Sequence, residues 1–523
     1  MDGEVTPGSL PEPDGTSAAN ASLPQLIRNV VSQYASFLVG VAASLVLTRV
    51  LLRQLGAGPY GLWIVLLAIV GYLGLLDVGV GTAAVQRIAK LTAEGDSEGV
   101  ADVIRTSFVF FAVSGVVAVG ITAGLAPFLA SFLKLGTISP TVAGTTLIIL
   151  GVMTLFTFLA TAPNALLFGA GRGDRLAQIG LITLILTEVG QILAVLAGGG
   201  LIALAILQTA GLALGLVISA FAASRVTGSP LRHGRFRRPL LGELIRFGGL
   251  QATIALSSVF AYQLDALIIG IILPVSQVAP YNIALNTSNL SRNLSTIGTN
   301  LLLPTYTHFE TTGDRRRQAD YFCRSVLVSL VVSVPIVIAL AAFGEPILQL
   351  WLGAVPPKTY EIVIALGIVT AIQLPGHQCF LFLTGVGRNR LLAKLATIGA
   401  VLNLAGSIAA TFWLGPVGPA IGSMPPVIVI DFVVLPIVVC NHLGVPFRRY
   451  ARSALGPVVP VAVVAGGLAL LLIHLHPAHS GLAAVIGAVV VVLGSWAALA
   501  LIVARLEPEL RDSLWQRIRD RRR

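Results

Sequence analysis

Charged residues are scarce in this chain of 523 residues, of which only 11% are Asp, Glu, Lys or Arg. Soluble domains carry about 25% charged residues, so the deficit excludes an ordinary water-soluble fold. Hydrophobic residues make up 55% of the sequence, and the mean hydropathy is +0.89. Its 55 glycines and 28 prolines are spread through the apolar segments, as they are in membrane helices. The composition therefore indicates an integral membrane protein.

Cysteine is also scarce, and acidic residues are fewer than basic ones. Cys323, Cys379 and Cys440 lie far apart, which excludes a disulfide framework and a cysteine metal site. The net charge of +11 would suggest a nucleic-acid partner in a soluble protein, but in a membrane protein it indicates basic cytoplasmic loops. Residues 1–24 lack the basic start of a signal peptide and are rich in Pro, Gly and Ser, so they are predicted to be a disordered tail.

Fourteen apolar runs approach or exceed the length of about 20 residues that a helix needs to cross a hydrocarbon layer of about 30 Å. They cover residues 30–52, 59–83, 106–131, 142–168, 177–197, 201–222, 244–273, 278–303, 325–343, 359–383, 392–413, 417–439, 455–475 and 481–503. These runs predict an all-α membrane fold of fourteen spans.

The placement of Lys and Arg supports this number, because basic residues concentrate on the cytoplasmic side of membrane helices. With the N-terminus inside, 28 of the 34 basic residues fall in inside segments. The outside segments hold Arg49, Arg53, Lys134 and Lys358. A wrong number of spans would exchange inside and outside for every segment after the miscounted span, and the basic residues would then no longer gather on one side. We therefore predict that both termini are cytoplasmic.

The connecting loops are too short for a soluble catalytic domain. The longest inside loop covers residues 223–243, and outside loops reach about fifteen residues. We therefore expect no enzyme activity, no cofactor and no metal site, and we place the function between the helices.

Two short motifs recur at nearly one offset. LLFGAGR (166–172) is matched by FLTGVGR (382–388), and GPYG (58–61) by APYN (279–282). Such a repeat predicts two six-helix lobes with substrate binding between them. The predicted parts are the tail (1–24), an N-lobe (25–223), a basic cytoplasmic linker (224–243), a C-lobe (244–441), two further spans (442–504) and a basic amphipathic C-terminal tail (505–523).

Asparagines follow one face of the eighth span. Asn282, Asn286, Asn289 and Asn293 recur at spacings of 4, 3 and 4, which places them in one row on a helix. Gln33 belongs to a similar polar row on the first span. Amides that face lipid hydrocarbon lose their hydrogen-bond partners at a high cost. The asparagine row is therefore predicted to line a water-filled cavity.

Ionisable residues inside spans are the strongest candidates for function. Asp265 in span seven and Arg292 in span eight would each cost about 2.5 to 3.5 kcal/mol to insert at a helix centre. Either they form a salt bridge between the two spans, or each faces the cavity. Asp77 lies too far from the basic loop at Arg87 to reach water from the membrane edge, so it is predicted to point inward.

Three other titratable residues lie within spans. Glu188 and Asp431 are predicted nearer the lobe cores, where a hydrogen-bonded packing role is the alternative to a functional one. His377 follows Pro375-Gly376, a local helix break at which an imidazole can meet water.

Residues 48–96 carry a recognisable pattern: an arginine (Arg49), a Gly-x-x-x-Tyr-Gly turn (56–61), Leu-Leu-Asp-x-Gly-x-Gly (75–81) and a basic end. This segment resembles the opening of Wzx-type polysaccharide-biosynthesis flippases, which belong to the multidrug/oligosaccharidyl-lipid/polysaccharide exporter superfamily. The segment FAYQLDALIIGIIL, with Asp265, is similar to the second-lobe motif of that family.

The resemblance implies a flippase that moves polyprenyl-(pyro)phosphate-linked saccharide to the outer leaflet of the cell inner membrane by alternating access. By this resemblance Arg292 contacts the phosphate, and the asparagine row, Arg49 and Gln33 contribute to substrate binding. Asp77 and Asp265 couple transport to H+ or Na+. Expected partners are the lipid-linked saccharide, membrane lipids and polysaccharide-assembly proteins.

Three alternatives stay open at this point. A multidrug cation antiporter of the same superfamily would favour an acidic cavity without Arg292. A non-transporting cell-wall scaffold would use the amphipathic tail (505–523). A membrane-embedded glycosyltransferase would need a large outside loop or an Asp-x-Asp metal site, and the sequence has neither.

Overall fold

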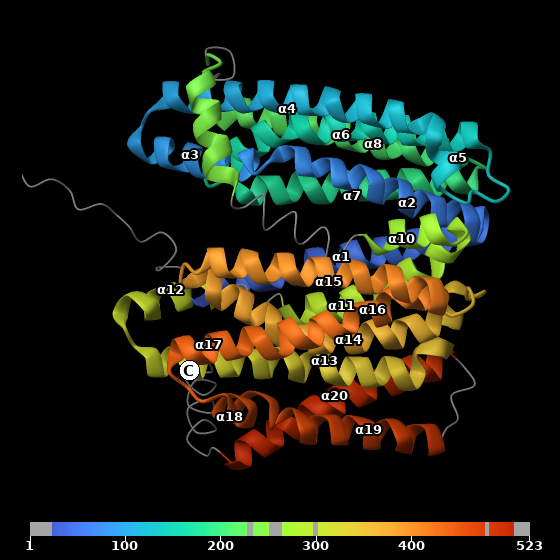
Figure 1. The fold of residues 1–523 in the computed structure, drawn as a ribbon, viewed down its shortest axis with the longest axis vertical. Helices are drawn as coiled ribbons and strands as arrows, with labels where there is room; N and C mark the ends of the chain where they lie inside the picture. Colours follow the sequence, from blue (N-terminus) through green and yellow to red (C-terminus); the bar gives the residue numbers. More distant parts are fainter. Residues whose placement is uncertain (1–22, 227–233, 250–263, 297–301, 476–480, 507–523) are drawn as a thin grey trace, which may run out of the picture.

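The computed structural model describes all residues except 1–22, 227–233, 250–263, 297–301, 476–480 and 507–523. The described residues are helical throughout, apart from turns and an isolated β-bridge between Lys134 and Pro274. Two lobes lie one above the other (Figure 1). Ten candidate spans are long and apolar enough to cross a membrane. The chain is therefore a multi-pass membrane protein, while the number fourteen and the sidedness of the termini stay predictions.

The N-lobe consists of α1 (Leu23–Leu55), α2 (Ala57–Leu73), α3 (Val80–Glu94), α4 (Ser97–Leu125), α5 (Leu129–Phe132), α6 (Pro140–Gly169), α7 (Gly173–Leu196) and α8 (Leu201–Val226). Helix α6 lies at its centre and packs against α3, α4 and α8, while α1 packs against α7. Large apolar side chains remain exposed on the outer helices, among them Val117 of α4 and Leu193 of α7. Such exposure suits a surface that faces lipid.

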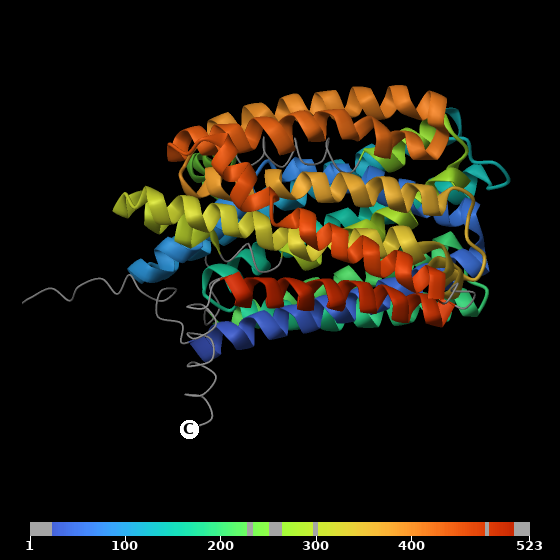
Figure 2. The same ribbon diagram turned by 90° about the horizontal axis from the view of Figure 1, so that it is seen from below.

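The C-lobe consists of α10 (Asp265–Ile272), α11 (Val278–Thr296), α12 (Leu303–Thr312), α13 (Arg315–Leu352), α14 (Thr359–Gly385), α15 (Asn389–Leu414), α16 (Gly418–Pro426), the π-helical segment η7 (Val427–Val434) and α17 (Leu435–Leu443). The short α18 (Phe447–Tyr450) leads into α19 (Val458–Leu475) and α20 (Gly481–Leu506), and these last two helices pack on α13 (Figure 2).

The predicted span 59–83 is broken in the structure. Helix α2 ends at Leu73, the 3-10 turn η1 (Gly74–Asp77) follows, and α3 begins at Val80. The chain turns at Val78 (φ 50°) and Gly79 (φ 78°), which hold left-handed conformations. An apolar run predicts membrane residence but carries no information on φ, so the candidate span is found at Ala57–Asp77 while the break after it could not be predicted.

Candidate functional site

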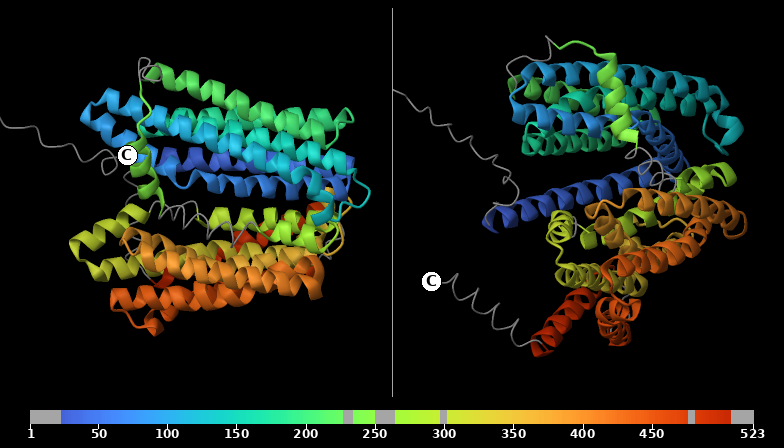
Figure 3. Two further views of the ribbon diagram at one scale, coloured as in Figure 1. Left: turned by 45° about the horizontal axis from the view of Figure 1, so that its top comes forward. Right: turned by 60° about the vertical axis from the view of Figure 1, so that its left-hand side comes forward.

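The two lobes meet along the first half of α2. This helix packs against α10, the short turn η4 (Val275–Gln277) and α11. Buried side chains form one apolar core across the contact, including Leu62 and Leu66 of α2 with Ile269 of α10 and Ile283 of α11. Both lobes extend away from this region (Figure 3). We term it the closed end.

Polar contacts reinforce the closed end. The Nε of Arg53 donates to the carbonyl of Leu352 at 3.0 Å, and the Nζ of Lys134 donates to the carbonyl of Ile272 at 2.6 Å. The backbone N–H of Val275 donates to the carbonyl of Lys134 at 3.2 Å, beside the β-bridge. Arg53 and Lys134 were noted in the sequence only for their charge, yet both join the lobes.

Tyr60 forms a side-chain bond between the lobes. Its hydroxyl on α2 donates to the Oδ1 of Asn282 on α11 at 2.9 Å, and the Nδ2 of Asn286 donates to the same oxygen at 3.2 Å. Tyr60 belongs to GPYG and Asn282 to APYN, so the two recurring motifs contact each other. Gly61 permits this approach, because a Cβ there would lie 1.9 Å from the carbonyl oxygen of Val275.

The predicted asparagine row leads away from this bond along α11. Asn282, Asn286, Asn289 and Asn293 are all half-buried. On the opposite side of the helix Ser288, Ser291 and Ser295 are buried, and Ser291 lies 3.2 Å from Ser333 of α13. Residues on one helix face point in similar directions. Because Asn282 points at the N-lobe, the rest of the row points to the side of α11 that faces that lobe.

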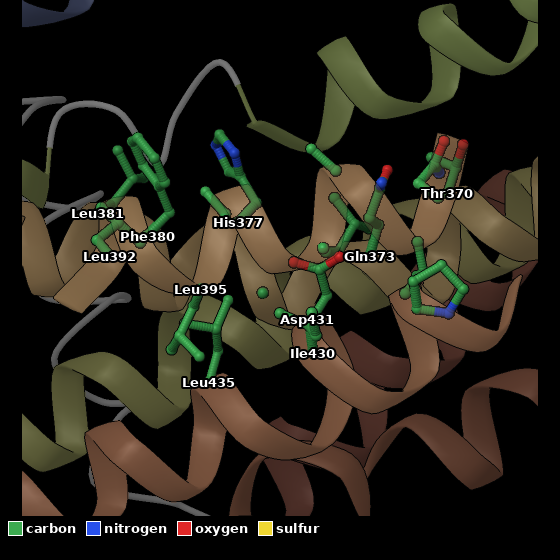
Figure 4. A pocket seen from close by; sticks show the side chains of 18 of the residues that line it. Thr370, Gln373, His377, Phe380, Leu381, Leu392, Leu395, Ile430, Asp431 and Leu435 are labelled. Atoms are coloured by element: carbon green, nitrogen blue, oxygen red, sulfur yellow. The ribbon is translucent and has the colours of Figure 1, made fainter. Parts of the chain in front are cut away.

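Arg292 lies on a neighbouring row of α11 and lines a cavity inside the C-lobe. The cavity holds about 410 Å³ and is enclosed by α11, α14, α15, α16 and η7. Its polar side chains include Gln373 and His377 of α14, Asn403 of α15 and Asp431 of η7 (Figure 4). Leucine side chains and Phe380 form much of the remaining wall.

Asp265 and Arg292 are not a pair. Asp265 begins α10 and accepts a hydrogen bond from the hydroxyl of Tyr281. Arg292 is eleven residues beyond Tyr281 on α11, a distance of about 16 Å along the helix axis at 1.5 Å per residue. The salt bridge that the sequence left open is therefore absent. Tyr281, whose signal was the APYN motif, supplies the partner of Asp265 instead.

Asp77 holds the break between α2 and α3. Its Oδ1 accepts the backbone N–H of Gly81 at 2.8 Å, so it satisfies one free donor at the start of α3. Directly after it, a Cβ on Gly79 would lie 2.3 Å from the carbonyl oxygen of Gly248. Asp77 thus lies where the N-lobe meets the helical residues 238–249, which precede α10 in the chain.

Those residues are attached to the N-lobe. The backbone N–H of Arg235 donates to the Oδ1 of Asp102 at 2.7 Å, and the guanidinium of Arg237 forms an ion pair with the same carboxylate. Asp102 is only 4% exposed. Residues 244–249, which were predicted to open the C-lobe, also lie against the N-lobe, because Leu244 packs in one buried cluster with Phe111 and Gly248 contacts Gly79.

The two other predicted site residues lie on α1. Arg49 is half-buried at the closed end, between Leu45 and Arg53. The carbonyl of Leu45 accepts the indole N–H of Trp351 at 3.0 Å. Arg49 is thus at the opposite end of the asparagine row from Arg292. The side chain of Gln33 lies outside the described residues.

The fold is shared with solved membrane transporters. The lipid II flippase MurJ in an inward closed conformation is 14% identical, with a TM-score of 0.71 over 91% of this chain and 99% of that one. A multidrug resistance MATE family transporter of the MOP superfamily, in an inward-facing conformation, is 16% identical, with a TM-score of 0.63 over 77% of this chain and 95% of that one.

The sequence itself was compared with curated proteins, and none matched. A family model described as polysaccharide biosynthesis protein matches residues 46–355, which is more than half of the chain. The matched region contains the Leu-Leu-Asp-x-Gly-x-Gly segment, the closed end and the asparagine row. The resemblance drawn from residues 48–96 is therefore confirmed, and the chain belongs to the family of polysaccharide biosynthesis proteins.

Proposed function

We propose that this protein is a flippase that carries a polyprenyl-(pyro)phosphate-linked oligosaccharide or cell-wall precursor from the cytoplasmic to the outer leaflet of the inner membrane. The observation that carries the proposal is the asparagine row, which starts at the contact between the lobes and follows the side of α11 that faces the N-lobe. Amide side chains donate and accept hydrogen bonds, as sugar hydroxyls require.

The phosphate of the substrate requires a cation near this row. Arg292 lies one residue from Asn293 and three from Asn289 on α11. Its planar guanidinium suits bidentate contact with a phosphate. Asp77 and Asp265 remain the proposed coupling residues of the two lobes, and Arg49 and Gln33 are proposed to contribute to binding from α1.

Alternating access requires the closed end to open and close. The hydrogen bond between Tyr60 and Asn282 joins neutral groups and contributes about 0.5 to 1.5 kcal/mol, while the bonds from Arg53 and Lys134 to backbone carbonyls contribute about 1.5 to 3 kcal/mol each. Contacts of this strength are reversible. The basic segments predicted to be cytoplasmic, among them 172–175 and 388–394, follow the ends of α6 and α14 that lie away from this contact, so the closed end is assigned to the outer side.

The test is flipping by purified protein in vesicles. Fluorescent lipid-linked saccharide is placed in both leaflets, and a membrane-impermeant reagent reports the fraction reached from outside. Protein-dependent exchange supports the proposal, and no exchange above that of empty vesicles contradicts it. Export of organic cations without any movement of lipid-linked saccharide would instead assign the chain to the drug antiporters.

A further inference from the structure

Asp431 occupies an unusual position inside the C-lobe cavity. It lies on η7, between Pro425-Pro426 and α17, where the helix is wound with π-helical bonds. Such segments are rare and occur frequently at functional sites. In the described part of the chain, no hydrogen bond or ion pair joins its carboxylate to another side chain. Asp431 is half-buried in a largely apolar wall, where a carboxylate without a hydrogen-bond donor is stabilised by a proton or a cation.

Helix α14 is shaped to accommodate this side chain. A Cβ on Gly376 would lie 2.4 Å from the Cβ of Asp431 and 2.5 Å from its Oδ1. The preceding residue, Pro375, cannot donate the helical bond to the carbonyl of Ala371. Figure 4 shows Asp431 beside Gln373, with His377 one turn further along α14. The two local irregularities, Pro375-Gly376 and η7, thus meet at one carboxylate.

The remaining groups of the cavity favour a proton over a metal cation. Arg292 of α11 and His377 of α14 line the same space. Helices α15 and α16 contribute no charged group to the described lining, and α15 supplies the amide of Asn403. A guanidinium in the cavity repels any cation, but a proton delivered by hydronium forms a covalent O–H bond to the carboxylate and leaves a neutral acid and a water molecule, whereas a sodium ion keeps its charge beside the guanidinium. Among the described residues the buried Nε2 of His377 has no hydrogen-bond partner, so a second titratable side chain lines this cavity.

We propose that Asp431 is a proton-binding carboxylate, seated against Gly376 between α14 and η7. A proton that enters the cavity with water forms an O–H bond to one carboxylate oxygen, and its loss restores the anion. Helix α11 connects this site to the lobe contact, since it carries both Arg292 at the cavity and Asn282 at the closed end. A role in driving transport rests on the proposed function, whereas proton binding does not.

Labelling with dicyclohexylcarbodiimide tests proton binding directly. This apolar reagent adds to protonated carboxyl groups in membrane proteins and leaves a stable acylurea that mass spectrometry locates. We expect modification of Asp431 in the full chain to increase as the pH is lowered and to be unaffected by sodium at constant ionic strength. Protection by sodium at constant pH would show a metal cation site instead, and absence of modification at every pH would overturn the proposal.

Two glycines of α14 supply a matched pair of variants. Gly376→Ala should reduce the labelling of Asp431, because the added methyl group displaces the carboxylate. Gly367→Ala should not, because a Cβ there meets only the two methyl groups of Val337, at 3.4 and 3.7 Å. Equal labelling of both variants would contradict the seating of Asp431 against Gly376.

Transport assays separate this inference from the proposed function. Asp431→Asn should fold and should weaken the pH dependence of flipping, since Asp77 and Asp265 remain in this variant. Labelling of Asp431 without any flipping would leave the proton site intact and reject the flippase. Flipping whose pH dependence is the same in Asp431→Asn as in the unaltered protein would reject coupling through Asp431.

Discussion

The hydroxyl of Tyr60 donates a hydrogen bond of 2.9 Å to the side-chain oxygen of Asn282, across the contact between the two lobes. The two residues are 222 positions apart, and each belongs to one copy of a recurring motif. The same oxygen accepts from Asn286, so the bond that joins the lobes is also the first member of the asparagine row. The hydrogen bonds of the first two asparagines therefore depend on whether the lobes are in contact at the closed end.

Removal of this bond should favour the opposite state. Tyr60→Phe keeps the ring in the apolar core and loses one hydrogen bond, at a cost of about 1 kcal/mol. A change of this size alters a two-state ratio about fivefold. Distances between spin labels on α4 and α15 should show a larger population of molecules in which the lobes have separated at the closed end. Tyr306→Phe is the control, because Tyr306 bonds Ser325 within the C-lobe at 2.9 Å, and an equal shift in both variants would contradict the assignment.

Arg292 should behave independently of Asp265. Because about 16 Å of α11 separates Arg292 from the partner of Asp265, the double variant Asp265→Asn, Arg292→Gln should not recover flipping lost in Arg292→Gln. Arg292→Lys should keep partial flipping, since it retains the charge but loses the planar fork. Initial flipping rates, measured at matched expression and Tm, decide the question. Recovery in the double variant would mean that neutralising Asp265 is the role of Arg292.

Asp77 has a structural role that can be separated from coupling. Asn accepts a hydrogen bond at a helix N-terminus about as well as Asp, whereas Ala loses about 0.5 to 2 kcal/mol. We therefore expect Asp77→Ala to lower the Tm and Asp77→Asn to retain it. If Asp77 also couples transport, Asp77→Asn should fold normally and lose flipping driven by an ion gradient. Normal gradient-driven flipping by Asp77→Asn would mean that the role of Asp77 is limited to the hydrogen bond at the start of α3.

Gly79 and Gly95 form a controlled comparison. Both have positive φ, 78° and 75°, so Ala strains the backbone at each. Only Gly79 also lies against another backbone, at Gly248, whereas a Cβ on Gly95 meets nothing within 4 Å. Gly79→Ala should therefore lower the Tm further than Gly95→Ala in the same detergent. Equal losses of Tm in the two variants would show that the packing of residues 238–249 does not depend on the contact between Gly79 and Gly248.

The sequence predicted the helical fold, the family and the polar face of α11, because apolar length, motif spacing and helical periodicity are local properties. The sequence did not decide whether Asp265 and Arg292 form a salt bridge, because it indicates that their spans are neighbours but not at what depth in the membrane each residue lies. Gly376 and Asp431 are 55 positions apart, and their contact depends on how α14 packs on η7. The break at Val78 depends on backbone conformation, which hydrophobicity does not encode.

The most direct test of alternating access is a reversible lock at the closed end. The parallel β-bridge between Lys134 and Pro274 places their Cα atoms about 5 Å apart, within the range of a disulfide. Lys134→Cys, Pro274→Cys is made with Cys323, Cys379 and Cys440 replaced by serine or alanine. The control keeps only Lys134→Cys. We predict that oxidation abolishes flipping of lipid-linked saccharide in the double variant and that reduction restores it, while the control is unaffected. Undiminished flipping by fully cross-linked protein would contradict the account.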